Sequence, residues 1–185
     1  MQEALVRPAA PIRGNGRPLI SSRRIARRVR ELGREISAVY ADIDQPLVMV
    51  VILKGAAVFA ADLLRSLSIP AEIEFVRASS YGQRTSSTGR VKFAHLVEGP
   101  LTARHLLLVE DIVDSGRTIN VINRELRRAH PASVRLAALL DRPARREEEV
   151  AIHFTGFVIP DRFVVGYGLD YAGLYRELPA IYSLG

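Results

Sequence analysis

The sequence of 185 residues lacks several features that define other classes of protein. It has no cysteine, so disulfides play no part in its stability. Its longest apolar run, residues 46–53, has the length of a strand and is too short to span a membrane. The first residues contain no apolar signal core followed by a cleavage site. We therefore expect a cytoplasmic protein without a membrane partner.

Lysine is almost absent, although the net charge is +6 and the isoelectric point is about 10.1. Only Lys54 and Lys92 are lysines, and much of the arginine lies between residues 7 and 34. Nucleic-acid sites combine basic residues with aromatic ones, yet Tyr40 is the only aromatic residue before Phe59. We therefore interpret the arginines as a solvated helix face and expect no nucleic-acid partner.

Hydrophobic patterns divide the chain into an arm and one domain. Residues 1–20 show no period and are expected to form an N-terminal arm, which leaves 21–185 as the domain. Within the domain, amphipathic helical patterns alternate with short runs rich in Val and Ile, and Ser21 or Ser22 is expected to cap the first helix. This alternation predicts an α/β fold, an open and mainly parallel sheet flanked by helices on both faces. The expected helices are 25–40, 56–67 and 117–129, and the expected strands are 47–53, 72–78, 106–109, 134–140, 152–158 and 163–167.

One strand-to-helix junction, LLLVEDIVDSGRT at residues 106–118, contains most of the chemistry. Two adjacent acids and then a third follow the apolar run, and a glycine turn opens a helix. Backbone N–H groups at such a turn bind phosphate, and paired acids suit ribose hydroxyls or a hard cation. The simpler interpretation, helix capping by Asp114 or Ser115, explains one polar residue but not the two acids before it. The sequence has neither the Walker pattern nor the dinucleotide glycine pattern, which argues against ATP hydrolysis and dinucleotide binding.

Four motifs in order resemble those of the type I phosphoribosyltransferases, and in particular the hypoxanthine-guanine phosphoribosyltransferase family. Residues 110–118 resemble the phosphoribosyl pyrophosphate signature, and Lys54-Gly55 resembles the pyrophosphate loop. Ser80-Tyr81, in a small and polar stretch at 79–89, resembles the start of the catalytic lid. IPDRFVVGYGLDY at 159–171 is similar to the base-binding hood and continues into Arg176 and Leu178-Pro179. The resemblance covers roughly residues 15–182.

The resemblance implies purine salvage that depends on Mg²⁺. The phosphoribosyl group would pass from phosphoribosyl pyrophosphate to N9 of hypoxanthine or guanine, giving IMP or GMP and pyrophosphate. It also implies a homodimer or homotetramer, a cis peptide before Lys54, and a hood formed largely by 152–185 with the N-terminal segment. Asp114 is implied as the catalytic acid beside purine N7, Phe163 as the residue that stacks on the base, and the Val164 backbone as the group that reads its edge. The sets implied are Lys54, Gly55, Ser80, Tyr81, Glu110, Asp111, Asp114, Ser115, Gly116, Arg117, Thr118 and Arg176 for phosphoribosyl pyrophosphate and nucleotide, Ile112, Arg142, Phe163, Val164, Leu169 and Asp170 for the purine, and Glu110, Asp111 and Asp170 for the metal.

The chain departs from the family at Arg142, where a lysine usually donates a hydrogen bond to the purine 6-oxo group. A guanidinium also donates, but its planar fork is bulkier than an ammonium. We expect Arg142 to keep the donor role and to reject adenine, whose 6-amino group is a donor. Arg142→Lys is then expected to keep activity on hypoxanthine and guanine, and Arg142→Ala to weaken both. The preference among hypoxanthine, guanine and xanthine is left open.

Other interpretations compete with this one. A nucleotide-sensing regulator of the same fold could bind RNA or DNA through the basic helix at 23–34, and sister transferases act on xanthine, orotate, adenine or uracil. Taken singly, Lys54 could be a surface lysine, Phe163 a core residue and Asp170 a helix cap. The residues at 79–89 are expected to be mobile without ligand and to close over pyrophosphate during turnover.

Overall fold

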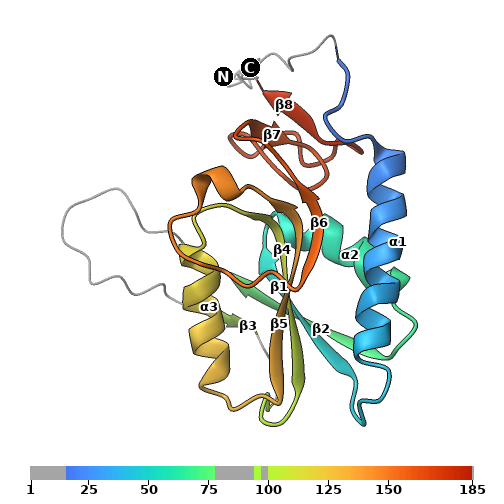
Figure 1. Cartoon of the computed structure of the whole chain (residues 1–185), viewed down its shortest axis with the longest axis vertical. Helices are drawn as coiled ribbons and strands as arrows, with labels where there is room; N and C mark the ends of the chain where they lie inside the picture. The colour runs from blue at the N-terminus through green and yellow to red at the C-terminus, as the bar shows by residue number, and fades with distance from the viewer. Residues whose placement is uncertain (1–15, 78–93, 97–99, 185) are drawn as a thin grey trace, which may run out of the picture.

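The computed structural model describes residues 16–77, 94–96 and 100–184. One sheet lies between two layers of helices, and a small second sheet lies beyond one of its ends (Figure 1). This arrangement confirms the predicted open α/β fold. The described elements are α1 (Ser22–Val39), β1 (Leu47–Leu53), α2 (Ala56–Ser66), β2 (Ala71–Arg77), β3 (Ala94–Leu96), β4 (His105–Val113), α3 (Arg117–Arg127), β5 (Ser133–Asp141), the 3-10 turn η1 (Pro143–Arg145), β6 (Phe154–Val158), β7 (Phe163–Val165) and β8 (Tyr182–Leu184).

The large sheet has the strand order β3-β2-β1-β4-β5-β6. Strands β2, β1, β4, β5 and β6 are parallel, and β3 joins the edge at β2 in the antiparallel sense. Because parallel strands end at the same edge of a sheet, the segments that follow β1, β4 and β5 meet there. That edge lies below the antiparallel pair β7–β8 (Figure 1).

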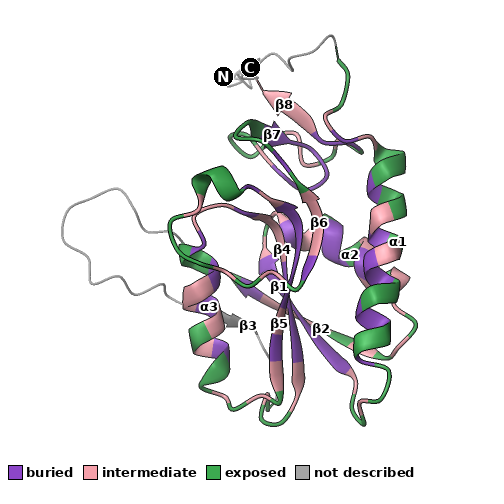
Figure 2. Cartoon of the chain, viewed as in Figure 1, coloured by how far each residue is buried: buried purple, intermediate pink, exposed green. Residues whose placement is uncertain are grey.

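The two faces of the sheet bury alternate side chains of β1, which is why this strand reads as one continuous apolar run. Met49 and Val51 pack with α1 and α2, whereas Val48 and Val50 pack with α3. Figure 2 shows the central strands buried along most of their length. The site at the sheet edge therefore rests on strands that are held from both sides.

The first helix begins where the sequence predicts, with Ser21 as its N-cap. The residue before it, Ile20, is buried and exchanges two backbone hydrogen bonds with Ile181 of the hood, at 3.1 and 3.0 Å. The last residue of the predicted arm is therefore part of the hood. No described helix is long and apolar enough to cross a membrane.

Several element boundaries differ from the sequence prediction. Strand β4 does not end at Val109, because its pairing with β5 continues to Val113 opposite Asp141, so both acids lie within the strand. Strand β7 ends at Val165, since the next two residues have positive φ angles, 99° and 52°. The short strands β3 and β8 were not predicted, because three residues show no measurable period. The predicted lid at 79–89, with Ser80 and Tyr81, lies outside the described residues.

Candidate active site

The turn after β1 brings the backbone close to the acids of β4. The Leu53–Lys54 peptide is cis, which confirms what the resemblance to the family implied. The Lys54 side chain is exposed. A Cβ atom on Gly55 would overlap Oδ2 of Asp111, and one on Gly168 would overlap the Gly55 carbonyl. Only glycine permits these two close contacts. The turn after β1, the hood and the β4 acids therefore pack directly against one another.

The two acids of β4 are held in surroundings that disfavour their charge. Asp111 Oδ1 accepts a hydrogen bond from the Ile112 amide at 2.8 Å, whereas Glu110 Oε2 is buried without a partner among the described residues. Burial, and then the neighbouring Asp111 carboxylate, raises the pKa of Glu110 well above its ordinary value. Burial also raises the pKa of Asp111 to about 6. A cation or a set of hydroxyl donors would relieve both groups.

The turn that opens α3 has the form of a phosphate site. Its N-cap is Gly116, in the left-handed conformation at φ 88°, which has no side chain to cap the helix. Ser115 Oγ accepts from the Arg117 amide at 3.4 Å, which accounts for one polar residue of this turn but not for Asp114 or for the two acids before it. The Ser115 carbonyl accepts from the Glu147 and Glu148 amides at 3.0 and 2.9 Å, which fixes the turn. A pocket of about 80 Å³ lies here, lined by Glu110, Ile112, Val113, Asp114, Ser115, Gly116, Thr118 and Ile119.

Arg142 joins this turn to the hood. Its Nε donates to Asp114 Oδ1 at 2.6 Å, its Nη2 donates to Asp114 Oδ2, and its Nη1 donates to the Arg162 carbonyl at 2.6 Å. The Arg142 side chain is only 6% exposed, whereas that of Asp114 is 37% exposed. The guanidinium is thus buried behind the carboxylate, which itself faces open space.

A second pocket, of about 190 Å³, lies between these acids and the hood. Phe163 borders it with 46% of its surface exposed, and its ring meets Tyr171 edge-to-face with the centroids 5.8 Å apart. An exposed ring at a pocket wall is a platform on which a flat ligand can stack. The pocket contains all six residues predicted for the purine: its lining is Asp111, Ile112, Asp114, Arg142, Phe163, Val164, Leu169 and Asp170.

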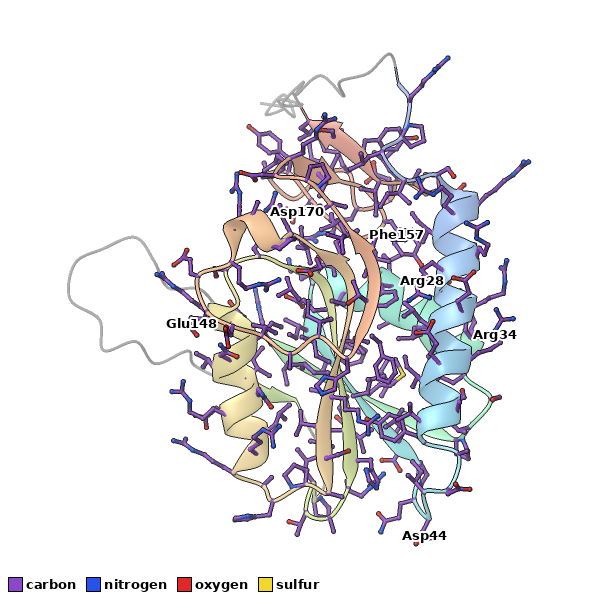
Figure 3. The ribbon with its side chains drawn as sticks, in the orientation of Figure 1. Arg28, Arg34, Asp44, Glu148, Phe157 and Asp170 are labelled. Carbon is purple, nitrogen blue, oxygen red and sulfur yellow. The ribbon has the colours of Figure 1, made fainter. Side chains whose placement is uncertain are left out.

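Asp170 and Arg176 are paired in the hood (Figure 3 labels Asp170). Arg176 Nη2 lies 2.6 Å from Asp170 Oδ1, and its Nη1 donates to the Gly168 carbonyl. The other oxygen of Asp170 accepts from the Gly173 amide at 2.8 Å, so Asp170 stabilises a turn and does not cap a helix. Within the described ranges, no group of three or more His, Cys, Asp or Glu residues is arranged to hold a metal, so Glu110, Asp111 and Asp170 form no site made of protein ligands alone.

Comparison with known proteins identifies the family. The phosphoribosyl transferase domain matches residues 19–172 of this chain. The chain belongs to this family. It is 43% identical over 163 residues to the hypoxanthine phosphoribosyltransferase of Salmonella typhimurium, covering 88% of this chain and 92% of that protein. It is also 43% identical over 170 residues to the hypoxanthine-guanine phosphoribosyltransferase of Mycobacterium avium, covering 90% and 84%. The crystal structure of a hypoxanthine-guanine phosphoribosyltransferase from Bacillus anthracis is similar at a TM-score of 0.83 and 38% identity, covering 91% and 98%.

In this phosphoribosyltransferase most of the predicted site residues lie close together. Two of the described site residues, Arg117 and Lys54, are exceptions. Arg117 is exposed and pairs with Glu147 rather than lining the phosphate pocket. The backbone of Lys54 lies in the turn beside the site, but its side chain has no ion-pair partner among the described residues.

Some contacts of the phosphoribosyltransferase site were missed in the sequence. The Tyr167 hydroxyl donates to Asp62 Oδ2 at 2.6 Å and ties the hood to α2. The glycines on both sides of Tyr167, in the sequence GYG, indicate a segment with an unusual backbone conformation. The Arg162 carbonyl that binds Arg142 is a backbone group, and no residue type could have revealed it.

Proposed function

We propose that this enzyme transfers the 5-phosphoribosyl group of phosphoribosyl pyrophosphate to N9 of hypoxanthine or guanine, releasing pyrophosphate and giving IMP or GMP. One observation supports this most directly. The six residues predicted for the purine line a single pocket together with Asp114, and this pocket adjoins the glycine turn that opens α3 and suits a phosphate. The substrates named for the similar proteins agree with the proposal.

Asp114 is the proposed catalytic residue, positioned for proton transfer at purine N7. As N9 attacks the anomeric carbon and the bond to pyrophosphate breaks, electron density leaves the base. The Asp114 carboxylate holds or accepts the N7 proton, because it lines both the purine and the phosphate pockets. Phe163 stacks on the base, and the Val164 backbone reads its edge. Excluding water from this pocket protects the oxocarbenium-like centre from hydrolysis.

The two β4 acids are proposed to hold the ribose hydroxyls, directly or through Mg²⁺. The donor set suits that ion, since Mg²⁺ binds one or two carboxylates and takes its remaining oxygens from water and substrate phosphates. Glu110 Oε2, buried without a partner in the part of the chain that the structure describes, and the raised pKa of Asp111 both suit a cation bound beside these acids. When bound, the ion would neutralise the pyrophosphate charge that develops as the bond breaks.

The remaining assignments concern the two phosphate groups. Ser115, Gly116, Arg117 and Thr118 are proposed for the 5′-phosphate, Arg117 through its backbone because its side chain pairs with Glu147, and the helix N-terminus favours an anion there. Lys54, Gly55 and Arg176 are proposed for pyrophosphate, with Asp170 as a second metal anchor through water. In this role the Arg176 guanidinium contacts pyrophosphate and Asp170 at the same time. Assembly as a homodimer or homotetramer and action in the cytoplasm also belong to this proposal.

A regulator that binds nucleic acid through α1 is less consistent with the structure. Arg28 donates to the Thr155 and Gly156 carbonyls of β6 and pairs with Glu35 at 2.6 Å (Figure 3). The guanidinium of Arg24 lies 5.7 Å from the centroid of the Phe157 ring. These arginines therefore have partners within the chain and attach α1 to the edge strand β6.

A panel of bases tests the proposed function. The protein is incubated with phosphoribosyl pyrophosphate and Mg²⁺ and with hypoxanthine, guanine, xanthine or adenine in turn, and nucleotide is quantified. We expect turnover with hypoxanthine or guanine, and none with adenine. Preference for xanthine would select the alternative specificity. Nucleotide binding without turnover of any base would favour a regulator and refute the proposal.

A further inference from the structure

We infer that Arg142 is a positioning residue for Asp114: it fixes the carboxylate and ties it to the hood strand that carries the stacking platform. This role is separate from reading the purine 6-oxo group. It rests on the proposed function, in which Asp114 manages the N7 proton.

The contacts of Arg142 form a clamp with two ends. At one end, Nε and Nη2 bind both oxygens of Asp114, in the bidentate geometry that fixes the plane of a carboxylate. At the other end, Nη1 binds the Arg162 carbonyl, one residue before Phe163. The Arg142 amide also donates to the Val113 carbonyl at 3.1 Å, next to Asp114. One buried side chain therefore sets the distance between the acid and the stacking platform.

The clamp leaves Asp114 able to react. Each carboxylate oxygen has two lone pairs, and the guanidinium uses one on each, so a further hydrogen bond from purine N7–H can form. The exposed side of Asp114 faces the purine pocket, while Arg142 lies buried behind it. Without the clamp, the Asp114 carboxylate would rotate about χ2, a terminal torsion angle with broad energy minima.

A lysine at this position cannot reproduce the clamp. Its ammonium is a point charge on a flexible stem, whereas the guanidinium fork matches two carboxylate oxygens in one plane. Lysine would still offer a cation to the purine 6-oxo group. The expectation from the sequence that Arg142→Lys keeps activity on hypoxanthine and guanine therefore becomes more specific: base binding is expected to survive, and the chemical step is expected to slow.

The test compares Arg142→Lys and Arg142→Met with Arg145→Met, a nearby control. Arg145 lies in η1, is half exposed and pairs with Asp161 at the surface, where such pairs contribute little. Single-turnover rate, KM for hypoxanthine and Tm are measured for each. For Arg142→Lys we expect KM within about 3-fold of the wild type and a single-turnover rate lower by roughly 10- to 100-fold, the scale of a misplaced catalytic group. For the control we expect wild-type values.

Coupling to Asp114 separates positioning from a general structural role. If Arg142 acts through Asp114, adding Arg142→Lys to Asp114→Asn slows the reaction by less than about 3-fold beyond the single variant. Fully additive losses, or a wild-type single-turnover rate in Arg142→Lys, would overturn the inference. So would a change confined to KM in Arg142→Met.

The same experiments distinguish failure of the proposed function. If the wild type forms no nucleotide from any base, the proposed function is wrong. Ligand-free crystal structures then test separately whether Arg142 positions the Asp114 carboxylate. We expect the Asp114 carboxylate in Arg142→Met to occupy more than one orientation. A single orientation, unchanged from the wild type, would overturn the positioning role.

Discussion

Replacing Asp111 with asparagine is expected to stabilise the metal-free protein at neutral pH while destroying its activity. Asparagine keeps the Oδ1 acceptor for the Ile112 amide and removes the buried charge. Burial raises the pKa of Asp111 from 3.8 to about 6. Between these values the folded protein binds more protons than the unfolded chain, so stability falls as pH rises from about 4 to about 6. The charged carboxylate then costs the fold up to about 3 kcal/mol at higher pH, since each pKa unit corresponds to about 1.4 kcal/mol.

The assay is urea denaturation from pH 4.5 to pH 8 in EDTA, at fixed protein concentration. The free energy of unfolding of Asp111→Asn should exceed that of the wild type by about 2–3 kcal/mol at pH 8 and by much less at pH 4.5. Asp161→Asn, which changes an exposed carboxylate, should stay within about 0.5 kcal/mol of the wild type throughout.

Ligand binding supplies a second check of the same reasoning. Magnesium pyrophosphate should stabilise the wild type more than Asp111→Asn, because bound cation offsets the buried charge. A difference between the two proteins that stays constant across the pH range would refute the argument, since it would show that the charge of Asp111 is not the source. The trade-off is that of an active site that gives up stability for function.

Three further predictions concern individual site residues. Asp114→Asn should lower the single-turnover rate by about 10²–10⁴-fold with little change in affinity for phosphoribosyl pyrophosphate, and a near-wild-type rate would contradict its catalytic role. Gly116→Ala places a Cβ 2.5 Å from the Glu148 carbonyl at φ 88°, and should destabilise the protein by about 1–3 kcal/mol in chemical denaturation and weaken IMP binding. An unchanged stability would show that the turn adapts. Phe163→Ala should raise KM for hypoxanthine by roughly 10- to 100-fold, because base stacking contributes about 1–3 kcal/mol, with a smaller effect on kcat; an unchanged KM would mean that the ring does not stack on the base.

The sequence by itself determined the fold class and most of the element order. The apolar run at 47–53 and the amphipathic stripe of α1 are local patterns with a clear period, and burial on a sheet or under a helix requires that period. Boundaries were less well determined. The end of β4 depends on pairing with β5, which no local pattern contains. The three-residue strand β8 exists only because the distant β7 pairs with it.

The resemblance to the family implied which residues gather at the purine pocket, and the fold is consistent with that set, since parallel strands bring their ends to one edge and the motifs follow those strands. Only the tertiary structure decided how these residues contact one another. The resemblance implied Arg142 as a reader of the base, and only the structure showed that its guanidinium also binds Asp114 and the backbone carbonyl of Arg162 in the hood. Hydrogen-bond partners depend on distances of a few tenths of an ångström between segments far apart in the chain. Such distances follow from the packing of the whole domain and are not encoded in any local run of residues.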